Sequence, residues 1–532
     1  MKSRDSKKKQ LQGKRSEHPQ SPLREFWLPL IFIVGLISTS FSASVYQNTV
    51  LLGSLWAAAA VLLLWLVALA VVFSSTSIAP SFALTLRKQH YIQALVQLSL
   101  FAYWGYYWRP VYDHALLITA QLFFAYGFDM LLAWSRRRAY VLGFGPFPII
   151  FSINLFLWFK DDWFYLQFIM IAVGMLGKEY VRWRRDGNSV HIFNPSAFSL
   201  GLFSLILLVT NTTHLTWGQE IASTLTLAPH IYLFLFCIGL VVMYFFSITL
   251  VAATAAAVLF GLSALYSLLH DVPYFLDSEI PAAVFLGLHL LITDPSTSPR
   301  SVLGKALFGA LYGFGVFALY AMLSALGVPT FYDKLLCVPL LNLSVIIIDR
   351  FARRLHTLKP FQFADMPALP GAVNNALIAC WIIFFAGMTW LGKTDGRHLG
   401  DQLPFWQQAC VAGRSNACQR LVLLESTYCG DSSAWACNEL GIQYVEGKIV
   451  DADEELANSF FSRGCELRYQ AACYNLLDST TLLHDNPHEL DLRLLLREGG
   501  QNLMTMAKSD LYQRACAHGW AFACAGSVSL RR

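Results

Sequence analysis

Two polar stretches interrupt the apolar part of this sequence, and both carry side chains that could bind a ligand. Their polar residues are Asn194 and Ser196 in the first stretch, and Asp294, Thr297, Ser298 and Arg300 in the second. Amides, hydroxyls and carboxylates can hold a small solute or an organic cofactor, and Arg300 or Lys305 would favour a phosphate. The alternative is that both stretches are turns in which a proline starts or stops a helix. We favour a binding site.

The elements that lead into these stretches support that choice. Asn194-Pro195-Ser196 opens an apolar segment, whereas Asp294-Pro295 closes the short apolar segment 280–293. Short or proline-interrupted segments at corresponding places in two halves of a membrane protein point to a site near the interface of the halves. Broken backbone at membrane depth is tolerated only where it is buried in protein or lines a cavity.

The composition places the whole chain in the class of multi-pass membrane proteins. It has 532 residues, of which 56% are hydrophobic and 14% charged, with a mean hydropathy of +0.48. Soluble domains carry about 25% charged residues. Hydropathy predicts about thirteen apolar segments, most of them near the ~20 residues that a bilayer core requires. They are 26–43, 50–73, 90–108, 114–134, 139–159, 163–178, 189–209, 229–247, 249–269, 280–293, 302–326, 334–349 and 377–392.

The charge pattern predicts the orientation. The basic tail, residues 1–25, has no apolar core of a signal peptide, so we expect it to stay in the cytoplasm. Lys and Arg recur in alternate loops, which explains the net charge of +5 by the positive-inside rule and argues against a nucleic-acid partner. An odd number of crossings then places the C-terminal region outside, in the periplasm of a bacterium whose inner membrane holds the chain.

Polar residues inside apolar segments are the next candidates. Asp129 would cost about 2.5 kcal/mol or more at the centre of a span. It could relay a proton or ion, or form an ion pair with the arginines at 136–138. Four histidines, His114, His191, His230 and His289, lie in no recognisable haem motif and are expected to serve packing.

Eight cysteines after residue 400 form four pairs, each eight residues apart. They are Cys410 and Cys418, Cys429 and Cys437, Cys465 and Cys473, and Cys516 and Cys524. The 36-residue interval between the second and third pairs indicates a helical solenoid. Zinc sites prefer closer spacings, so we expect disulfides across the short turns between helices and no metal. Disulfides agree with an oxidising compartment.

The stretch ACNELGIQYVEGKIVDADEELANSFFSRGCELRYQAACYNL resembles a Sel1-like repeat. Matching positions include Ala436, Gly441, Tyr444, Gly447 and Ala457. The resemblance implies a solenoid of helical hairpins linked by disulfides over roughly 405–530. It also implies contact with a protein or ligand partner; a cap without a specific partner is the alternative.

FNPSAFSL together with TDPSTSPRSVLGKALFGALYGFG is similar to the NqrB/RnfD family, the membrane subunits of ion-translocating electron-transport complexes. The resemblance covers about 85–350. It implies a helical fold of inverted repeats related to urea transporters. It also implies FMN esterified to a threonine of a Ser-Gly-Ala-Thr motif and, in the family members that belong to sodium-translocating NADH:quinone reductase, a riboflavin as well. This chain lacks that motif. Thr224 in ASTLTL is the nearest analogue, and Thr212, Thr213, Thr216 or Thr226 are alternatives.

We therefore predict an all-α protein in five parts: a basic tail (1–25), N-terminal transmembrane helices (26–84), an NqrB/RnfD-like membrane domain (85–350), a cytoplasmic loop with the last transmembrane helix (351–400), and a Sel1-like repeat domain (401–532). Three functions follow as hypotheses. They are electron transfer with FMN or riboflavin, transport of a small solute without a cofactor, and a membrane anchor that presents the repeats to a protein partner.

Overall fold

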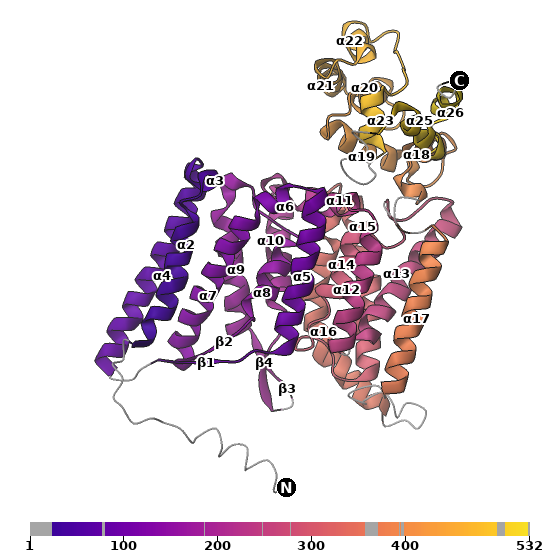
Figure 1. The fold of residues 1–532 in the computed structure, drawn as a ribbon. Coiled ribbons are helices and arrows are strands. Elements are labelled where there is room, and N and C mark those ends of the chain that lie inside the picture. Colours follow the sequence, from indigo (N-terminus) through magenta and orange to yellow (C-terminus); the bar gives the residue numbers. More distant parts are fainter. Residues whose placement is uncertain are drawn as a thin grey trace.

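The protein is a bundle of apolar helices that carries a small helical domain at one end (Figure 1). This computed structural model describes residues 24–76, 80–185, 187–246, 248–276, 278–356, 371–392, 394, 398–496 and 506–529. Most of the expected basic tail and the loop 357–370 lie outside the described residues. Four short strands lie at one end of the bundle, which we call the strand end. The opposite end, which carries the C-terminal domain, is called the domain end.

The first helices form a hairpin that packs on the side of the bundle. It consists of α2 (Trp27–Thr39) and α4 (Thr49–Thr76), joined by α3 (Ala43–Tyr46), and both long helices contact α7 (Ala115–Arg137). The short η1 (Arg24–Phe26) precedes them.

Ten helices follow in two sets of five. The first set is α5 (Lys88–Tyr107), α7, α8 (Pro146–Asn154), α9 (Tyr165–Tyr180) and α10 (Pro195–Val209). The second set is α12 (Ile231–Phe246), α13 (Thr249–His270), α14 (Ala282–Leu290), α15 (Val302–Ala325) and α16 (Asp333–His356). The linkers contain α6 (Pro110–Asp113), α11 (Gly218–Thr224) and the short turns η2 (Asp161–Trp163), η3 (Thr213–Leu215), η4 (Leu225–Leu227) and η5 (Thr330–Tyr332). One more helix, α17 (Gly371–Trp390), completes the bundle.

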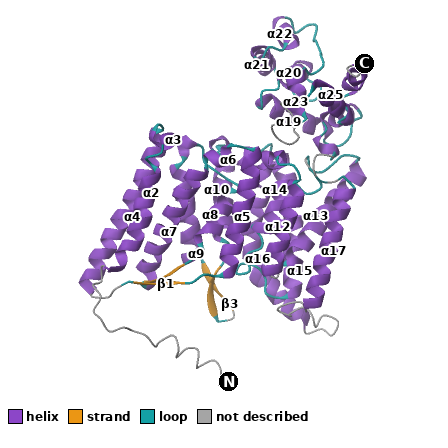
Figure 2. Ribbon diagram, in the orientation of Figure 1, coloured by secondary structure: helices purple, strands orange, loops and turns teal. Residues whose placement is uncertain are grey.

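The strands are an exception to the expected all-α fold (Figure 2). β1 (Ser81–Leu84) pairs in parallel with β2 (Ala139–Leu142), with Ser81 opposite Ala139. β3 (Arg182–Arg185) and β4 (Asn188–His191) form an antiparallel hairpin. Gly187 in its turn has a φ of 79°, a conformation that glycine adopts without steric cost.

The structure contains fewer full-length spans than the thirteen expected segments. Six helical stretches among the described residues are long and apolar enough to cross a membrane, and a seventh results if the pair Gly218–Leu227 and Ile231–Phe246, bent by 101°, counts as one span. Each expected segment does coincide with a helix, but several helices are short. α8 and α14 have nine residues each. Nine residues rise only ~14 Å, about half of a bilayer core.

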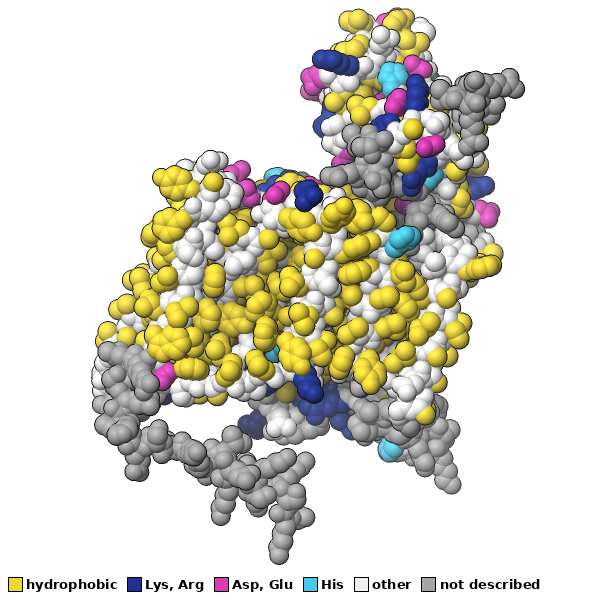
Figure 3. Space-filling view, in the orientation of Figure 1, with side chains coloured by type: hydrophobic (Ala, Val, Ile, Leu, Met, Phe, Trp, Pro, Cys, Tyr) yellow, Lys and Arg dark blue, Asp and Glu magenta, His cyan; other side chains and the backbone are white. Residues whose placement is uncertain are grey.

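Hydrophobic side chains cover the face of the bundle seen in Figure 3 between its two ends. Lys and Arg gather at the strand end. This distribution is that of a membrane protein, because an apolar belt of this kind would be unstable in water.

The C-terminal domain is built from pairs of short helices. These are α18 (Leu403–Val411), α19 (Ala417–Gly430), α20 (Ala434–Glu446), α21 (Glu454–Glu466), α22 (Gln470–Leu477), α23 (Glu489–Leu495), α25 (Lys508–Ala517) and α26 (Ala521–Ser529), preceded by η7 (Leu399–Asp401). All four expected disulfides are present, with Cα–Cα distances of 4.5 to 4.7 Å. The prediction of paired cysteines across helix turns is confirmed for all eight.

The C-terminal domain is docked on the second set of helices. Arg420 of α19 is buried; its Nη1 donates to the Tyr320 hydroxyl at 2.8 Å and its Nη2 to the carbonyl of Tyr274 at 3.3 Å. Its guanidinium also lies 4.9 Å from the Tyr320 ring centre. His398 and Glu279, both buried, lie 3.6 Å apart across the same junction. These polar contacts fix the domain to the bundle.

Candidate functional site

The two polar stretches selected from the sequence meet at the strand end of the bundle. The Asn194 side chain caps α10, because its Oδ1 accepts from the Ser196 backbone N–H at 3.1 Å and from the Ser196 hydroxyl at 2.8 Å. Its Nδ2 donates to the carbonyl of Leu291 at 3.1 Å, just after α14. One side chain therefore joins the start of α10 to the end of α14.

Asn342 of α16 ties both stretches together. Its Oδ1 accepts from the backbone N–H of Asn194 at 3.2 Å, and its Nδ2 donates to the carbonyl of Thr297 at 3.1 Å. Asn342 is 1% exposed, so both bonds are shielded from water. No sequence pattern pointed to Asn342, because its partners are distant along the chain.

A buried ion pair completes this arrangement. Arg185 Nη2 lies 2.6 Å from Asp349 Oδ2, and the two side chains are 5% and 8% exposed. Arg185 Nη1 also donates to the carbonyl of Ser298 at 3.0 Å, and Asp349 Oδ1 accepts from the backbone N–H of Arg300 at 3.2 Å. We call Arg185, Asn194, Asn342 and Asp349, with the turn 294–300, the strand-end cluster.

Asp294 organises the turn itself. Its carboxylate accepts from the Ser296 N–H at 2.9 Å and from the Thr297 hydroxyl at 3.3 Å. His191 of β4 lies 3.0 Å from the Ser296 hydroxyl and 3.9 Å from the Asp294 carboxylate. Burial alone would raise the pKa of Asp294, but hydrogen bonds from His191 and Ser296 hold it below its ordinary value. Asp294 therefore acts as an ionised turn-forming group.

The strand-end cluster does not fit the expected flavin. The donors of Asn194, Ser196 and Thr297 are already bonded to acceptors of the chain, so a flavin ring would have to displace them. A buried polar group that loses its partner costs about 1–3 kcal/mol. The cluster therefore links helices through hydrogen bonds and is not a preformed cofactor site.

Thr224, the expected attachment residue, lies elsewhere. It belongs to α11 at the domain end, and its hydroxyl donates to the carbonyl of Glu220 at 2.6 Å. The structure thus does not bring Thr224 together with Asn194 or Asp294.

Asp129 forms an ion pair, but with a partner different from the expected arginines. Its carboxylate lies 3.8 Å from Lys178 of α9. Arg137 instead pairs with Glu179 of α9 at 2.9 Å, and Arg136 Nε lies 3.8 Å from the same carboxylate. The expected pairing with 136–138 is therefore wrong.

The histidines occupy separate positions. His114 stacks on Trp158 with ring centres 4.2 Å apart, and His289 Nδ1 lies 2.8 Å from the carbonyl of Phe285 in its own helix. His191 contacts the turn 294–300 of the strand-end cluster through Ser296 and Asp294. Among the described residues no group of three or more His, Cys, Asp or Glu side chains could hold a metal ion.

A second buried polar group, at the domain end, was not suggested by the sequence. Asp333 and Lys334 open α16, and each is 2% exposed. Lys334 Nζ lies 3.3 Å from Asp333 Oδ1, donates to the carbonyl of Phe331 and lies 4.7 Å from the Phe331 ring centre. In the sequence this Asp-Lys dipeptide is typical of an exposed helix start. Only the tertiary fold reveals that it is buried.

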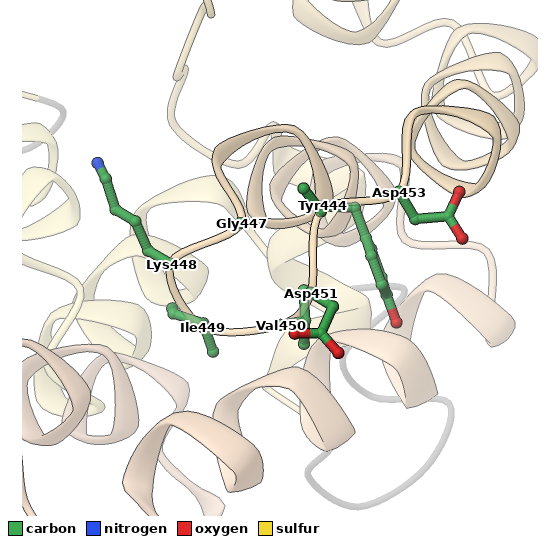
Figure 4. Close-up of a pocket in the computed structure, with 8 residues that line it drawn as sticks. Tyr444, Gly447, Lys448, Ile449, Val450, Asp451 and Asp453 are labelled. Carbon is green, nitrogen blue, oxygen red and sulfur yellow. The ribbon is translucent and has the colours of Figure 1, made fainter.

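The C-terminal domain has an open pocket of about 610 Å³ (Figure 4). It is formed by the loop between α20 and α21, and its lining is Tyr444, Gly447, Lys448, Ile449, Val450, Asp451, Ala452 and Asp453. Gly447 ends α20 with a φ of 62°, and the Asp453 side chain caps α21 by accepting from the Leu456 N–H. The lining residues thus have structural roles in the turn.

No family model, curated protein or solved structure matches this chain.

Proposed function

We propose that this chain is a membrane transport protein that moves a small solute through the interface of two inverted five-helix units. The observation that carries the proposal is the pair of nine-residue helices, α8 and α14. Both are third in their set, and both are buried: all nine residues of α14, and all of α8 except Phe147.

The order of the helices supports an inverted relationship. α5 starts beside β1 at the strand end, whereas α12 starts beside α11 at the domain end, so the two sets begin on opposite sides (Figure 1). α8 follows β2 from the strand end, and α14 follows the loop that contacts the C-terminal domain. Two half-length helices that enter from opposite sides are typical of transporters in which a site lies between repeats.

The chain supplies partners for the backbone that these short helices leave open. At the end of α8, the Asn154 carbonyl accepts from the Trp158 indole N–H, and further on the Phe159 N–H donates to Gln167 Oε1 at 3.1 Å. Beyond α14, the Leu291 carbonyl accepts from Asn194. Irregular backbone of this kind is stable at membrane depth only inside protein.

The two resemblances belong to the same proposal. A unit of the NqrB/RnfD type accounts for the ten central helices, and Sel1-like repeats account for the disulfide-linked hairpins. The proposed orientation puts the strand end in the cytoplasm and the C-terminal domain in the periplasm of a bacterial inner membrane. Arg and Lys at the strand end support that orientation.

Reconstitution into liposomes tests the proposal. Swelling of the proteoliposomes, followed by light scattering, is measured in a panel of polyols, amides and monocarboxylate salts. We expect at least one solute to enter faster than into protein-free liposomes, and Gly287→Ala to reduce the difference because the added Cβ would lie only 2.8 Å from the Tyr312 hydroxyl. Gly261→Ala is the matched control, since a Cβ there meets nothing within 4 Å. A rate equal to that of empty liposomes for every solute would refute transport.

A further inference from the structure

The start of α16 is a place where hydrogen-bond donors converge inside the bundle. Lys334 is buried there, and its own backbone N–H already donates to Asp333 Oδ1. The other N–H groups in the first turn of a helix have no intrahelical partners, and this end of the helix carries partial positive charge. The Tyr312 hydroxyl of α15 is 0% exposed and has no hydrogen-bond partner among the described residues. Such an orphaned hydroxyl costs free energy unless a ligand satisfies it.

Gly287 of α14 lies beside both Tyr312 and Lys334. A Cβ on Gly287 would lie 2.8 Å from the Tyr312 hydroxyl, 4.0 Å from Lys334 Cβ and 3.9 Å from the ring of Phe156. Because Gly287 has no side chain, the backbone of a half-length helix forms one bare wall. Phe156, which follows the other half-length helix, contributes an apolar edge. The position thus lies between the two proposed repeats.

The chemistry of these groups selects an anion with a small apolar part. An ammonium group, a hydroxyl donor and a helix N-terminus all favour a negatively charged acceptor, whereas Phe156 and Gly287 favour carbon. A monocarboxylate has both features. A second negative charge would have no positive partner among these groups.

Asp333 then determines how the charge is balanced. In the structure its carboxylate lies 3.3 Å from Lys334, and the pair is neutral as a whole. An added carboxylate would leave two negative charges beside one positive charge in a buried place, which is strongly unfavourable. Protonation of Asp333 removes this excess.

We propose, on the basis of the transport function above, that Tyr312, Lys334 and the start of α16 bind one monocarboxylate together with one proton. The proton binds to a carboxylate oxygen of Asp333, and Lys334 changes its ionic partner from Asp333 to the ligand. The net charge of the site is the same before and after. Release of the anion returns the proton and restores the Asp333–Lys334 pair, so the site couples the two without electron transfer.

Other titratable groups around Asp333 keep their protonation state in this scheme. Tyr312 of α15, Cys337 of α16 itself and Tyr274 of the loop after α13 lie within electrostatic range of Asp333. Glu220 of α11 is near Tyr332. His289 of α14 instead packs against Gly239 of α12. Asp333 is the carboxylate that forms the ion pair with Lys334.

Calorimetric titration of the full-length protein in detergent with sodium lactate tests this proposal without any need for transport. We expect binding that strengthens about tenfold for each unit by which the pH falls, with one proton taken up per lactate in buffers of different ionisation enthalpy. Tyr312→Phe should weaken binding about tenfold to hundredfold, and Lys334→Met should weaken it further. Asp333→Asn should bind lactate with an affinity that no longer depends on pH.

Controls separate loss of the site from loss of the fold. Lys448→Met removes an exposed lysine and should bind lactate like the wild type. The double variant Asp333→Asn/Lys334→Met buries no charge, so it should unfold at a temperature near that of the wild type and yet not bind lactate.

No lactate binding by the wild-type protein, or binding without proton uptake, would overturn the proposal. If another solute still enters the proteoliposomes in that case, the transport proposal is retained and only the proposed lactate site is refuted. Conversely, proton-linked lactate binding without entry of any solute of the panel refutes the transport proposal and leaves the binding site supported.

Discussion

Arg185 and Asp349 are separated by 164 residues in the sequence, yet their side chains form a 2.6 Å ion pair at the strand end. Arg185 belongs to β3, which follows the fourth helix of the first set, and Asp349 belongs to the last helix of the second set. The pair therefore joins the two proposed repeats. The Arg185 bond to Ser298 and the Asp349 bond to Arg300 extend this link to the turn after α14.

Loss of one partner should destabilise the protein more than loss of both. Asp349→Leu leaves the buried Arg185 unpaired, which we expect to cost about 3–5 kcal/mol, whereas Arg185→Met/Asp349→Leu should cost less because no charge remains buried. The midpoint of thermal unfolding in detergent, followed by tryptophan fluorescence, measures the difference. Glu446→Gln, which removes an exposed ion pair with Lys448, should change the midpoint of thermal unfolding little. A double variant as unstable as the sum of the single variants would contradict this account.

Thiol labelling should separate two classes of cysteine. The eight paired cysteines should react with a maleimide only after reduction, while the exposed Cys237 and Cys380 should react in the denatured protein without it. Replacing Cys429 and Cys437 together with serine should cost about 2.5 kcal/mol, since each disulfide closes a short loop. Mass spectrometry of the labelled peptides reads out the result. Labelling of any pair before reduction would show that this pair is not oxidised.

The buried Glu425 of α19 should make stability depend on pH. Burial chiefly, and then the charge of Glu439, raises its pKa well above the ordinary 4.5, against a smaller opposing effect of its hydrogen bond from Gln443. The folded state then holds a proton that the unfolded state releases, so this contribution to stability is complete below about pH 4.5 and declines as the pH rises toward the folded pKa.

Glu425→Gln keeps the shape and removes this titration. Between about pH 5 and pH 7 the unfolding temperature of the full-length wild type should fall relative to that of the variant. A difference between the two proteins that is constant over this range would show that Glu425 does not titrate there.

Arg420→Ala should loosen the C-terminal domain from the bundle. The change removes the hydrogen bonds to Tyr320 and to the Tyr274 carbonyl, and it leaves both partners at a buried junction. Hydrogen exchange should accelerate in the loop 271–276 and at the start of α19, while the strand-end cluster remains protected. Arg463→Ala, which removes a hydrogen bond to Gly430 within the domain, is the control. Equal exchange in both variants would mean that Arg420 does not hold the junction.

The flavin hypothesis has a direct spectroscopic test. Because Asn194, Ser196 and Thr297 use their donors on the chain itself, we expect the protein purified from flavin-replete cells to lack a flavin absorption band and in-gel flavin fluorescence. A yellow protein would restore electron transfer as the leading function. The Thr224→Ala variant would then show whether the flavin is attached at the nearest analogue of the family threonine.

The sequence by itself determined the membrane class, the helical character and the four disulfides. These properties depend on local quantities, namely the apolar content of each segment and the eight-residue spacing of cysteines across a turn. The sequence also drew attention to Asn194 and Asp294, because a broken apolar segment is visible in one dimension. It overestimated the number of full spans, since hydropathy does not distinguish a half-length helix with an extended continuation from a complete one.

Only the tertiary structure decided which polar groups meet. Asn342 and Asp349 join the two stretches from a helix more than 40 residues away, and Lys178 replaces the expected arginines beside Asp129. The burial of Asp333 and Lys334 is likewise invisible in a dipeptide that would suit any exposed helix start. The physical reason is that burial and hydrogen bonding depend on how helices pack against one another, and helix packing brings together residues whose separation along the chain is arbitrary.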